Sequence, residues 1–246
     1  MIRLLTYNIC RGGIGRERSI AEVIRASAAD VVVLQEATRP DVVRDLAAVT
    51  GMSVWAAKHG YSLGFMSRIP IARHEWDQPR GSRHAFLEIV PEGMALRVFG
   101  VHLSAVHAAW TERRRVRELA ALLRSINVHQ SGFHVLAGDF NALAPGELLD
   151  TRALPYRLRA LMWLSGGRVR WRTIQAVLDA QYVDAFRSRD ADDSGLTFPT
   201  WAPHVRLDYV FVPVAFAARV PVCRVVRDDP SVKASDHFPL LAELDC

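Results

Sequence analysis

Residues 133–141 read Phe-His-Val-Leu-Ala-Gly-Asp-Phe-Asn, an apolar run that ends abruptly in Asp139 and Asn141. A short apolar run of this kind is typical of a buried strand. Asp139 and Asn141 are two positions apart, so in an extended segment both can face one side while Phe140 packs the other way. The stretch therefore predicts a buried strand whose end presents a carboxylate and an amide together.

Other apolar runs of the chain also carry polar residues at one end. Polar residues follow three of these runs: Asn8 after residues 4–7, Glu36 after 31–35 and His102 after 96–101. Polar residues precede two later runs: Asp208 before residues 209–212, and Asp236 and His237 before 238–242. If the later strands run antiparallel to the earlier ones, all these residues share one rim of the fold. In open α/β sheets, ligands bind at that rim.

Helical periodicity separates some of the predicted strands. Apolar residues recur at helical spacing in two segments: Ile20, Val23 and Ile24, and then Val116, Leu119, Ala120 and Leu123 behind Thr111 as a cap. The stretches around residues 52–102 and 197–245 are rich in strand patterns. We therefore expect an α/β fold with two packed mixed β-sheets flanked by helices.

The composition is that of a globular protein: 246 residues, 50% hydrophobic and 23% charged. No linker, repeat or low-complexity stretch divides the chain, so we expect a single domain over residues 1–246. Neither a signal peptide nor a membrane span is predicted, because the run 209–218 is broken by Pro213. We therefore expect a cytoplasmic monomer with no integral membrane association.

Cysteine and charge usage narrow the class of protein. Cys10, Cys223 and Cys246 have no CxxC spacing, which argues against a disulfide framework or a thiolate zinc site. The net charge is +5, and Lys58 and Lys233 are the only lysines. Arginine suits phosphate recognition, although the excess can equally reflect the composition bias of a genome.

The predicted rim has the residue types of a metal-dependent hydrolase. Asn8 and Glu36 offer hard oxygen ligands, which match Mg²⁺ or Mn²⁺ better than zinc, and Asp236 adds negative charge toward the metal. Such an ion acts as a Lewis acid on a phosphoryl group. Taken singly, these residues could be turn or helix-terminal residues, but their coincidence at strand ends favours a common site.

His237 is the candidate base for an attacking water. Its other ring nitrogen needs an acceptor, and Asp208 is a better partner than the adjacent Asp236, whose side chain tends to point the other way. Asp139 and Asn141 would position the nucleophile and a phosphoryl oxygen. His102 would donate a hydrogen bond to the charge that develops on phosphorus, although a satisfied core histidine is the alternative.

Several of these runs resemble, in order, the motifs of the endonuclease/exonuclease/phosphatase superfamily. They are Thr6-Tyr7-Asn8-Ile9, Leu34-Gln35-Glu36, Val101-His102-Leu103, Gly138-Asp139-Phe140-Asn141, Arg206-Leu207-Asp208-Tyr209-Val210-Phe211 and Ser235-Asp236-His237-Phe238-Pro239-Leu240. Ser67-Arg68-Ile69-Pro70 is similar to a short arginine-proline element of that family. The resemblance extends from residue 6 to residue 240.

The resemblance implies a four-layer α/β sandwich and Mg²⁺-dependent cleavage of a phosphoester. For the rim residues the resemblance implies the roles already given, with Asn8 and Glu36 at the metal and Asp208 paired with His237. Relatives that act on abasic DNA carry a tyrosine where this chain has His102. In that respect the chain is more similar to the deoxyribonuclease, sphingomyelinase and inositol-phosphatase branches.

The substrate depends on the loops, because the superfamily cleaves DNA, RNA, phosphotyrosyl-DNA, sphingomyelin and phosphoinositides. Candidate substrate contacts are Arg11, Arg68, Trp201 and Arg206. DNA or a nucleotide-type ester is the first hypothesis and a phospholipid or phosphoinositide head group is the second. A non-catalytic protein that binds a phosphate ligand is a third, but it predicts a missing catalytic residue, and none is missing.

The most distinctive insertion is basic and helical, at about residues 150–180. Its apolar stripe is Leu154, Leu158, Leu161 and Met162, its arginines are Arg152, Arg157, Arg159, Arg168, Arg170 and Arg172, and its tryptophans are Trp163 and Trp171. It could form a nucleic-acid wall, an amphipathic segment on an anionic membrane, or a hairpin packed on the sheet. The cluster Arg113-Arg114-Arg115 is interpreted as a solvated helix face.

Overall fold

The structure is a computed structural model and describes residues 1–105, 108–147, 156, 159–160 and 169–246. Its strands form two six-stranded sheets that pack face to face. In sheet order, the first contains β11 (Val222–Val225), β12 (Leu240–Leu244), β1 (Ile2–Asn8), β2 (Val31–Gln35), β4 (Gly64–Ser67) and β3 (Val54–Ala57). The second contains β5 (Ile71–Asp77), β6 (Phe86–Pro91), β7 (Arg97–His102), β8 (His134–Asp139), β10 (Asp208–Pro213) and β9 (Tyr182–Asp184).

Both sheets are mixed, as predicted. β1 pairs with β2 in parallel and β7 with β8 in parallel, whereas the other pairs are antiparallel. The late strands β10 and β12 run antiparallel to β8 and β1, which confirms the polarity expected for the segments that follow Asp208 and His237. The polar ends of the early strands and the polar starts of the late strands therefore share a rim.

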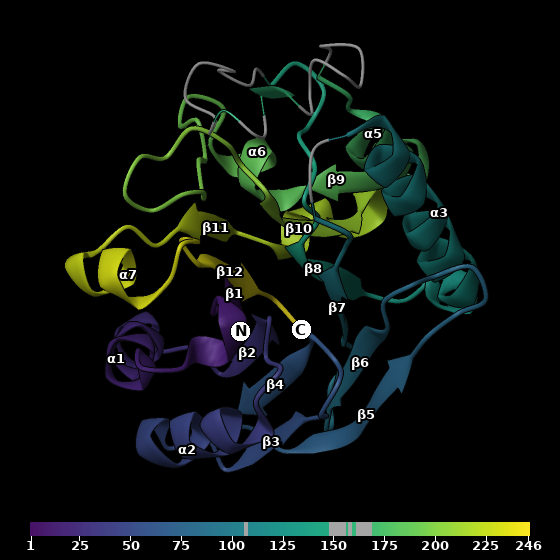
Figure 1. The fold of residues 1–246 in the computed structure, drawn as a ribbon. Helices are drawn as coiled ribbons and strands as arrows, with labels where there is room; N and C mark the ends of the chain where they lie inside the picture. The colour runs from purple at the N-terminus through teal and green to yellow at the C-terminus, as the bar shows by residue number, and fades with distance from the viewer. Residues whose placement is uncertain (106–107, 148–155, 157–158, 161–168) are drawn as a thin grey trace.

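Helices cover the outer face of each sheet and complete four layers (Figure 1). The first sheet carries α1 (Glu17–Ser27), α2 (Pro40–Thr50) and α7 (Asp229–Ala234), and the second carries α3 (Ala109–Ser125) and α5 (Arg172–Asp179). Shorter elements are α6 (Ala185–Arg189) and the 3-10 turns Arg11–Gly13, Asn127–His129 and Val214–Arg219. The four-layer α/β sandwich expected from the sequence is confirmed.

The β2 run shows why several strands are apolar throughout. Val31 and Val33 pack in the core between the two sheets, while Val32 and Leu34 pack under the helices of the first sheet. A strand that is buried on both faces needs apolar residues at every position, and not only at alternate positions. The run ends where Glu36 reaches the partly exposed rim.

Two expectations for α3 were wrong in detail. The backbone N–H of Ala108 donates to Thr111 Oγ1 at 3.0 Å, so Thr111 is a residue of the first turn and the helix is capped at Ala108. Arg115 is buried, with its guanidinium 2.8 Å from Glu112 Oε2 and 2.9 Å from the carbonyl oxygen of Ser104. The arginine cluster is therefore not a uniformly solvated face, because Arg115 turns inward to carboxylate and carbonyl partners.

The insertion is described only in part. Its helix α5 buries Ile174 and Val177 against the second sheet, and Trp171 Nε1 donates to the carbonyl oxygen of Glu147 at 3.1 Å. The apolar stripe, Trp163 and the arginines Arg152, Arg157 and Arg168 lie outside the described residues. Among the helices that are described, none has the length and apolar character needed to cross a bilayer.

Candidate active site

Strand register in the second sheet brings three candidate residues into one row. Asp139 ends β8, and it is paired with Asp208 at the start of β10 and with His102 at the end of β7. These residues are far apart in the sequence but occupy neighbouring positions on three adjacent strands. The row forms the half of the rim that the second sheet contributes.

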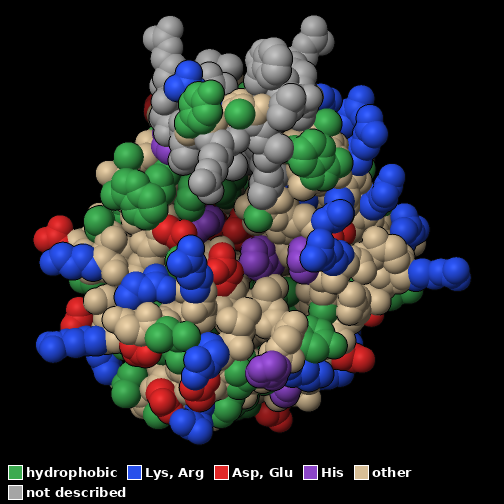
Figure 2. Space-filling view, viewed as in Figure 1, with side chains coloured by type: hydrophobic (Ala, Val, Ile, Leu, Met, Phe, Trp, Pro, Cys, Tyr) green, Lys and Arg blue, Asp and Glu red, His purple; other side chains and the backbone are tan. Residues whose placement is uncertain are grey.

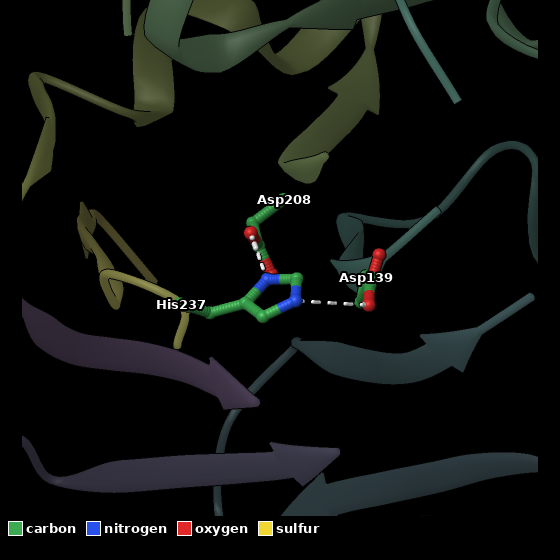
Figure 3. A group of neighbouring side chains, drawn as sticks. All are labelled: Asp139, Asp208 and His237. Carbon is green, nitrogen blue, oxygen red and sulfur yellow. Dashed lines mark hydrogen bonds and ion pairs between the residues drawn. The ribbon is translucent and has the colours of Figure 1, made fainter. Parts of the chain in front are cut away.

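His237 approaches this row from the first sheet. Its Nδ1 lies 2.9 Å from Asp208 Oδ2, and its Nε2 lies 3.9 Å from Asp139 Oδ2 (Figure 3). β12 begins only at Leu240, so His237 lies in the turn before the strand. Ser235 holds that turn on β1 by donating from Oγ to the carbonyl oxygen of Asn8 at 2.6 Å.

The side chain of Asn8 connects the two halves of the rim. Its Nδ2 donates to Asp139 Oδ2 at 3.1 Å and to Glu36 Oε1 at 3.4 Å. Its Oδ1 accepts from the backbone N–H of Cys10 at 3.0 Å. The amide nitrogen therefore faces the carboxylates, and the amide oxygen, expected from the sequence to be a metal ligand, faces the backbone of Cys10 instead. Asn8 thus joins Glu36 of the first sheet to Asp139 of the second.

Asn141 holds Asp139 from the other side. Its backbone N–H donates to Asp139 Oδ1 at 2.8 Å, and its Nδ2 donates to Asp139 Oδ2 at 3.2 Å and to the carbonyl oxygen of Leu103 at 3.0 Å. Both hydrogens of the amide are therefore used within the protein. Asp139 and Asn141 lie together with Phe140 buried behind them, but the Asn141 amide hydrogens are directed to Asp139 and Leu103 and not to a phosphoryl oxygen.

Burial and neighbouring charges shift the proton affinities at the site. Burial raises the pKa of Asp139 to about 7, against the opposing field of His237. Burial alone would lower the pKa of His237, but Asp208 and Asp139 outweigh it and raise that pKa to about 10. Burial lowers the pKa of His102 to about 4, so this imidazole is neutral near pH 7. Without a bound cation, His237 is the positively charged side chain of this group.

Unusual backbone conformations gather around these residues. Glu36, Asn141, Cys10 and Arg11 all have positive φ, between 50° and 55°. Such conformations cost free energy for residues other than glycine, and they cluster at functional sites. Gly138 stands at a close approach of two strands, because a Cβ added there would lie 1.8 Å from the carbonyl oxygen of Val101.

The donor atoms at the rim fit a hard divalent cation. Among the described residues, Asp139, Asp208 and His237 present ligand atoms within 4.8 Å of one another. In that group His237 already pairs with Asp208, whereas Asp208 Oδ1 is buried without a described partner. Glu36 adds a partly exposed carboxylate, and its Oε2 accepts from the backbone N–H of Arg11 at 2.5 Å. Carboxylate oxygens of this kind are the ligands that Mg²⁺ prefers.

Two of the four candidate substrate contacts lie beside the site. Arg11 and Trp201 line an open groove of about 670 Å³, together with Lys233 and the partly exposed Asp236. Trp201 is 71% exposed. The groove therefore presents basic and aromatic surface next to the rim, with Asp236 on its wall.

The structure does not bring the other two contacts to the groove. Arg68 lies at the opposite end of β2 from Glu36, because its backbone N–H donates to the carbonyl oxygen of Asp30. Arg206 is 2% exposed, and its guanidinium is paired with Asp184 at 2.5 Å and with Glu147 at 2.7 Å. Its charge is thus used inside the fold, where no substrate phosphate reaches it.

Two residues at the site, Ser235 and His84, were given no role in the sequence analysis. Ser235 stands in a motif that the sequence displays, but its contact with the Asn8 carbonyl depends on how β1 and β12 pair. His84 lies beside His102, with ring centroids 6.1 Å apart and an interplanar angle of 10°. No local pattern marks His84, because it comes from an irregular loop before β6.

The comparisons agree with this architecture. The chain is similar to a variant of the 3′ phosphatase NExo from Neisseria bound to a product DNA hairpin, with a TM-score of 0.76 and 19% identity over 100% of both chains. It is also similar to an AP endonuclease from Archaeoglobus fulgidus, with a TM-score of 0.73 and 18% identity over 100% of both chains. A humanized D. rerio TDP2 matches with a TM-score of 0.68 and 17% identity over 100% of this chain and 99% of that one. These identities establish the fold alone.

The family itself is established by the sequence. None of the curated proteins matches the chain significantly. The model of the Endonuclease/Exonuclease/phosphatase family, in contrast, matches residues 5–237, which include every rim residue described above. The chain therefore belongs to the Endonuclease/Exonuclease/phosphatase family and is a metal-dependent phosphoester hydrolase.

Proposed function

We propose that the protein hydrolyses phosphoester bonds in DNA or a nucleotide-type ester, with Mg²⁺ as its cation and Mn²⁺ as a substitute. One observation carries the proposal: the amide of Asn8 contacts both Glu36 and Asp139. Through this contact the Glu36 carboxylate of the first sheet lies near the pair of Asp208 and His237, which come from the C-terminal part of the chain. Acid, amide and imidazole groups thereby converge on one rim.

Glu36 is the residue that would hold the cation. Asn8 positions the Glu36 carboxylate, and Asp236 adds negative charge on the side of the groove. When bound, a divalent cation acts as a Lewis acid on the phosphoryl group. Because His237 already provides positive charge between Asp139 and Asp208, Glu36 rather than that pair would hold the cation.

Asp139, rather than His237 as expected from the sequence, would accept the proton of the attacking water, with the protonated ring of His237 beside it. Their facing atoms lie 3.9 Å apart, and the raised pKa of Asp139, about 7, suits a base that works at neutral pH. Asp208 fixes the orientation of the imidazole, and Asn141 fixes the carboxylate of Asp139. Neutral His102 would donate its N–H to the charge that develops on phosphorus.

The groove beside the site supports a nucleic-acid substrate. Trp201 is exposed where a base could stack, and Arg11 and Lys233 could neutralise strand phosphates. The similar NExo structure is bound to a DNA hairpin. A cytoplasmic location and a monomeric state remain predictions from the sequence.

A substrate panel with Mg²⁺ or with EDTA tests the proposal. It contains an abasic duplex, a 3′-phosphorylated duplex, a 5′-phosphotyrosyl oligonucleotide and phosphoinositide vesicles. We expect EDTA-sensitive cleavage of at least one DNA substrate by the wild type, and almost none by Asp139→Ala. Cleavage of the vesicles alone would identify a lipid head group, and not DNA, as the substrate. Activity that persists in EDTA would contradict the requirement for a metal ion.

A further inference from the structure

A second pair of histidine and carboxylate lies next to the candidate active site. His84 precedes β6, and its Nδ1 lies 3.4 Å from Glu118 Oε1 on α3. The His84 ring is nearly parallel to that of His102, with centroids 6.1 Å apart. Figure 2 shows histidine side chains beside acidic ones in the middle of the exposed face. The pair is looser than that of Asp208 and His237, because His84 Nδ1 lies near the carboxylate without a hydrogen bond to it.

Glu118 is built into the fold as an ionised group. Its side chain is fully buried, and it accepts from the backbone N–H of Ser104 at 3.2 Å and from Ser104 Oγ at 3.0 Å. Burial would raise the pKa of Glu118, but His84 and the Ser104 donors lower it below the usual value. Burying an ionised carboxylate costs free energy unless hydrogen bonds or an opposite charge compensate for it, and Ser104 and His84 are the groups that do so here. Glu118 thereby faces the His84 ring with a fixed negative charge.

We propose that His84, oriented by Glu118, contacts a phosphoryl oxygen of the substrate beside His102. The proposal rests on the proposed phosphoester hydrolysis and adds a second imidazole to its phosphate site. With Nδ1 directed at Glu118, the Nε2 edge of His84 is left for a ligand, and 32% of the side chain is exposed. When the ring is protonated, Nδ1–H faces the Glu118 carboxylate and Nε2–H is left to donate to a phosphoryl oxygen.

The spacing of the two rings suits a shared phosphoryl group. Hydrogen bonds from imidazole nitrogens to phosphate oxygens are about 2.8 Å long. Two nearly parallel rings 6.1 Å apart can therefore reach different oxygens of one tetrahedral group. In this arrangement His84 contributes to phosphate affinity, while Glu118 is a positioning residue that acts through His84.

Binding of inorganic phosphate tests this directly and does not require turnover. Isothermal titration calorimetry in the presence of Mg²⁺ would give the dissociation constant for the wild type, His84→Ala, Glu118→Gln and the double variant. We expect His84→Ala to weaken phosphate binding on the order of tenfold, as loss of a hydrogen bond to a charged group does. Glu118→Gln should weaken it in the same direction, and the double variant should be no weaker than His84→Ala.

The control is His129→Ala. His129 is a similarly exposed histidine, at 27%, whose Nε2 lies 3.9 Å from Glu88 Oε1. It should leave phosphate binding unchanged. Unchanged binding in His84→Ala would overturn the proposal even if Glu118→Gln fails to fold. Additive losses in the double variant would overturn the positioning role of Glu118.

Steady-state kinetics on a nitrophenyl phosphodiester separate this proposal from the proposed function. In His84→Ala we expect a higher KM with a smaller change in kcat, and partial recovery on addition of free imidazole. A wild type that hydrolyses no phosphoester would refute the proposed function. An active wild type with His84→Ala kinetics identical to it would refute only the role of His84.

Discussion

Asp208 lies directly opposite Asp139 in the antiparallel pair of β10 and β8, and the ring of His237 from the other sheet bridges their carboxylates. Two buried carboxylates that face each other repel, and an imidazolium between them offsets the repulsion. The sheet register thus places two negative carboxylates side by side, and the turn before β12 positions His237 between them. The following predictions depend on this arrangement.

Asp208→Asn should keep the shape of the pair but remove its charge. Without the carboxylate, His237 loses the partner that fixes its orientation, so we expect kcat to fall by roughly 10²- to 10⁴-fold. Steady-state kinetics on a nitrophenyl phosphodiester would measure the loss. Asp192→Asn, at an exposed aspartate, is the matched control and should behave as the wild type.

His237 should also make the stability of the cation-free protein depend on pH. The pKa of His237 is raised in the fold from 6.5 to about 10, so its stabilising contribution is complete below pH 6.5 and is lost as the pH rises toward 10. Thermal unfolding in EDTA between pH 6 and 10 should therefore show a smaller decline in Tm for His237→Gln than for the wild type. Parallel declines in the two proteins would argue against the raised pKa.

Asn8→Ala should weaken the cation site while Glu36, the proposed cation ligand, remains. Residues that orient metal ligands typically contribute about 10- to 100-fold to metal affinity. We expect the Mg²⁺ concentration for half-maximal activity to rise by that order. Asn127→Ala, at an exposed asparagine, is the control. An unchanged Mg²⁺ dependence would contradict the role of the Asn8 bridge.

Much of this rim could be predicted because the sequence places acid, amide and imidazole residues where apolar runs begin or end. Asp139 and Asn141 follow a buried strand, and their neighbours are set by strand pairing of predictable polarity. The pairing of His237 with Asp208 followed from the need of an imidazole for an acceptor on a different strand.

The remaining contacts depend on tertiary packing that no local pattern reveals. Arg206 stands in a motif next to Asp208, yet Asp184 and Glu147 bury its charge. His84 meets Glu118 only because a loop of the second sheet lies against α3. Arg68 was expected at the substrate, but the antiparallel pairing of β4 with β2 carries it to the opposite end of the sheet.

Gly138→Ala should destabilise the fold at the site. The added Cβ would lie 1.8 Å from the carbonyl oxygen of Val101, so β7 and β8 must separate next to His102 and Asp139. We expect a loss of about 3 kcal/mol or more in the free energy of unfolding, measured with urea. Gly81→Ala is the control for positive φ alone, because its φ is +97° and nothing lies within 4 Å of the added atom.

Trp201→Ala should affect DNA but not small substrates. Stacking of a base on an aromatic side chain contributes about 1–3 kcal/mol, so KM for a DNA substrate should rise by roughly 5- to 160-fold. The KM for a nitrophenyl phosphodiester should not change. Trp110→Ala, at a tryptophan of α3 that is 51% exposed, is the control. Equal effects on both substrates would place Trp201 outside the DNA-binding surface.

The most direct test of a single phosphoester-hydrolysing site is the Mg²⁺-dependent rate on a nitrophenyl phosphodiester for the wild type, Glu36→Gln and His237→Ala. Glu36 and His237 come from opposite ends of the chain and would meet at this site only through the contacts of Asn8 and Asp139. We predict that EDTA abolishes the wild-type rate, that Glu36→Gln needs more Mg²⁺, and that His237→Ala is nearly inactive at every Mg²⁺ concentration. A wild-type rate that persists in EDTA, or near-normal turnover by His237→Ala, would contradict the account.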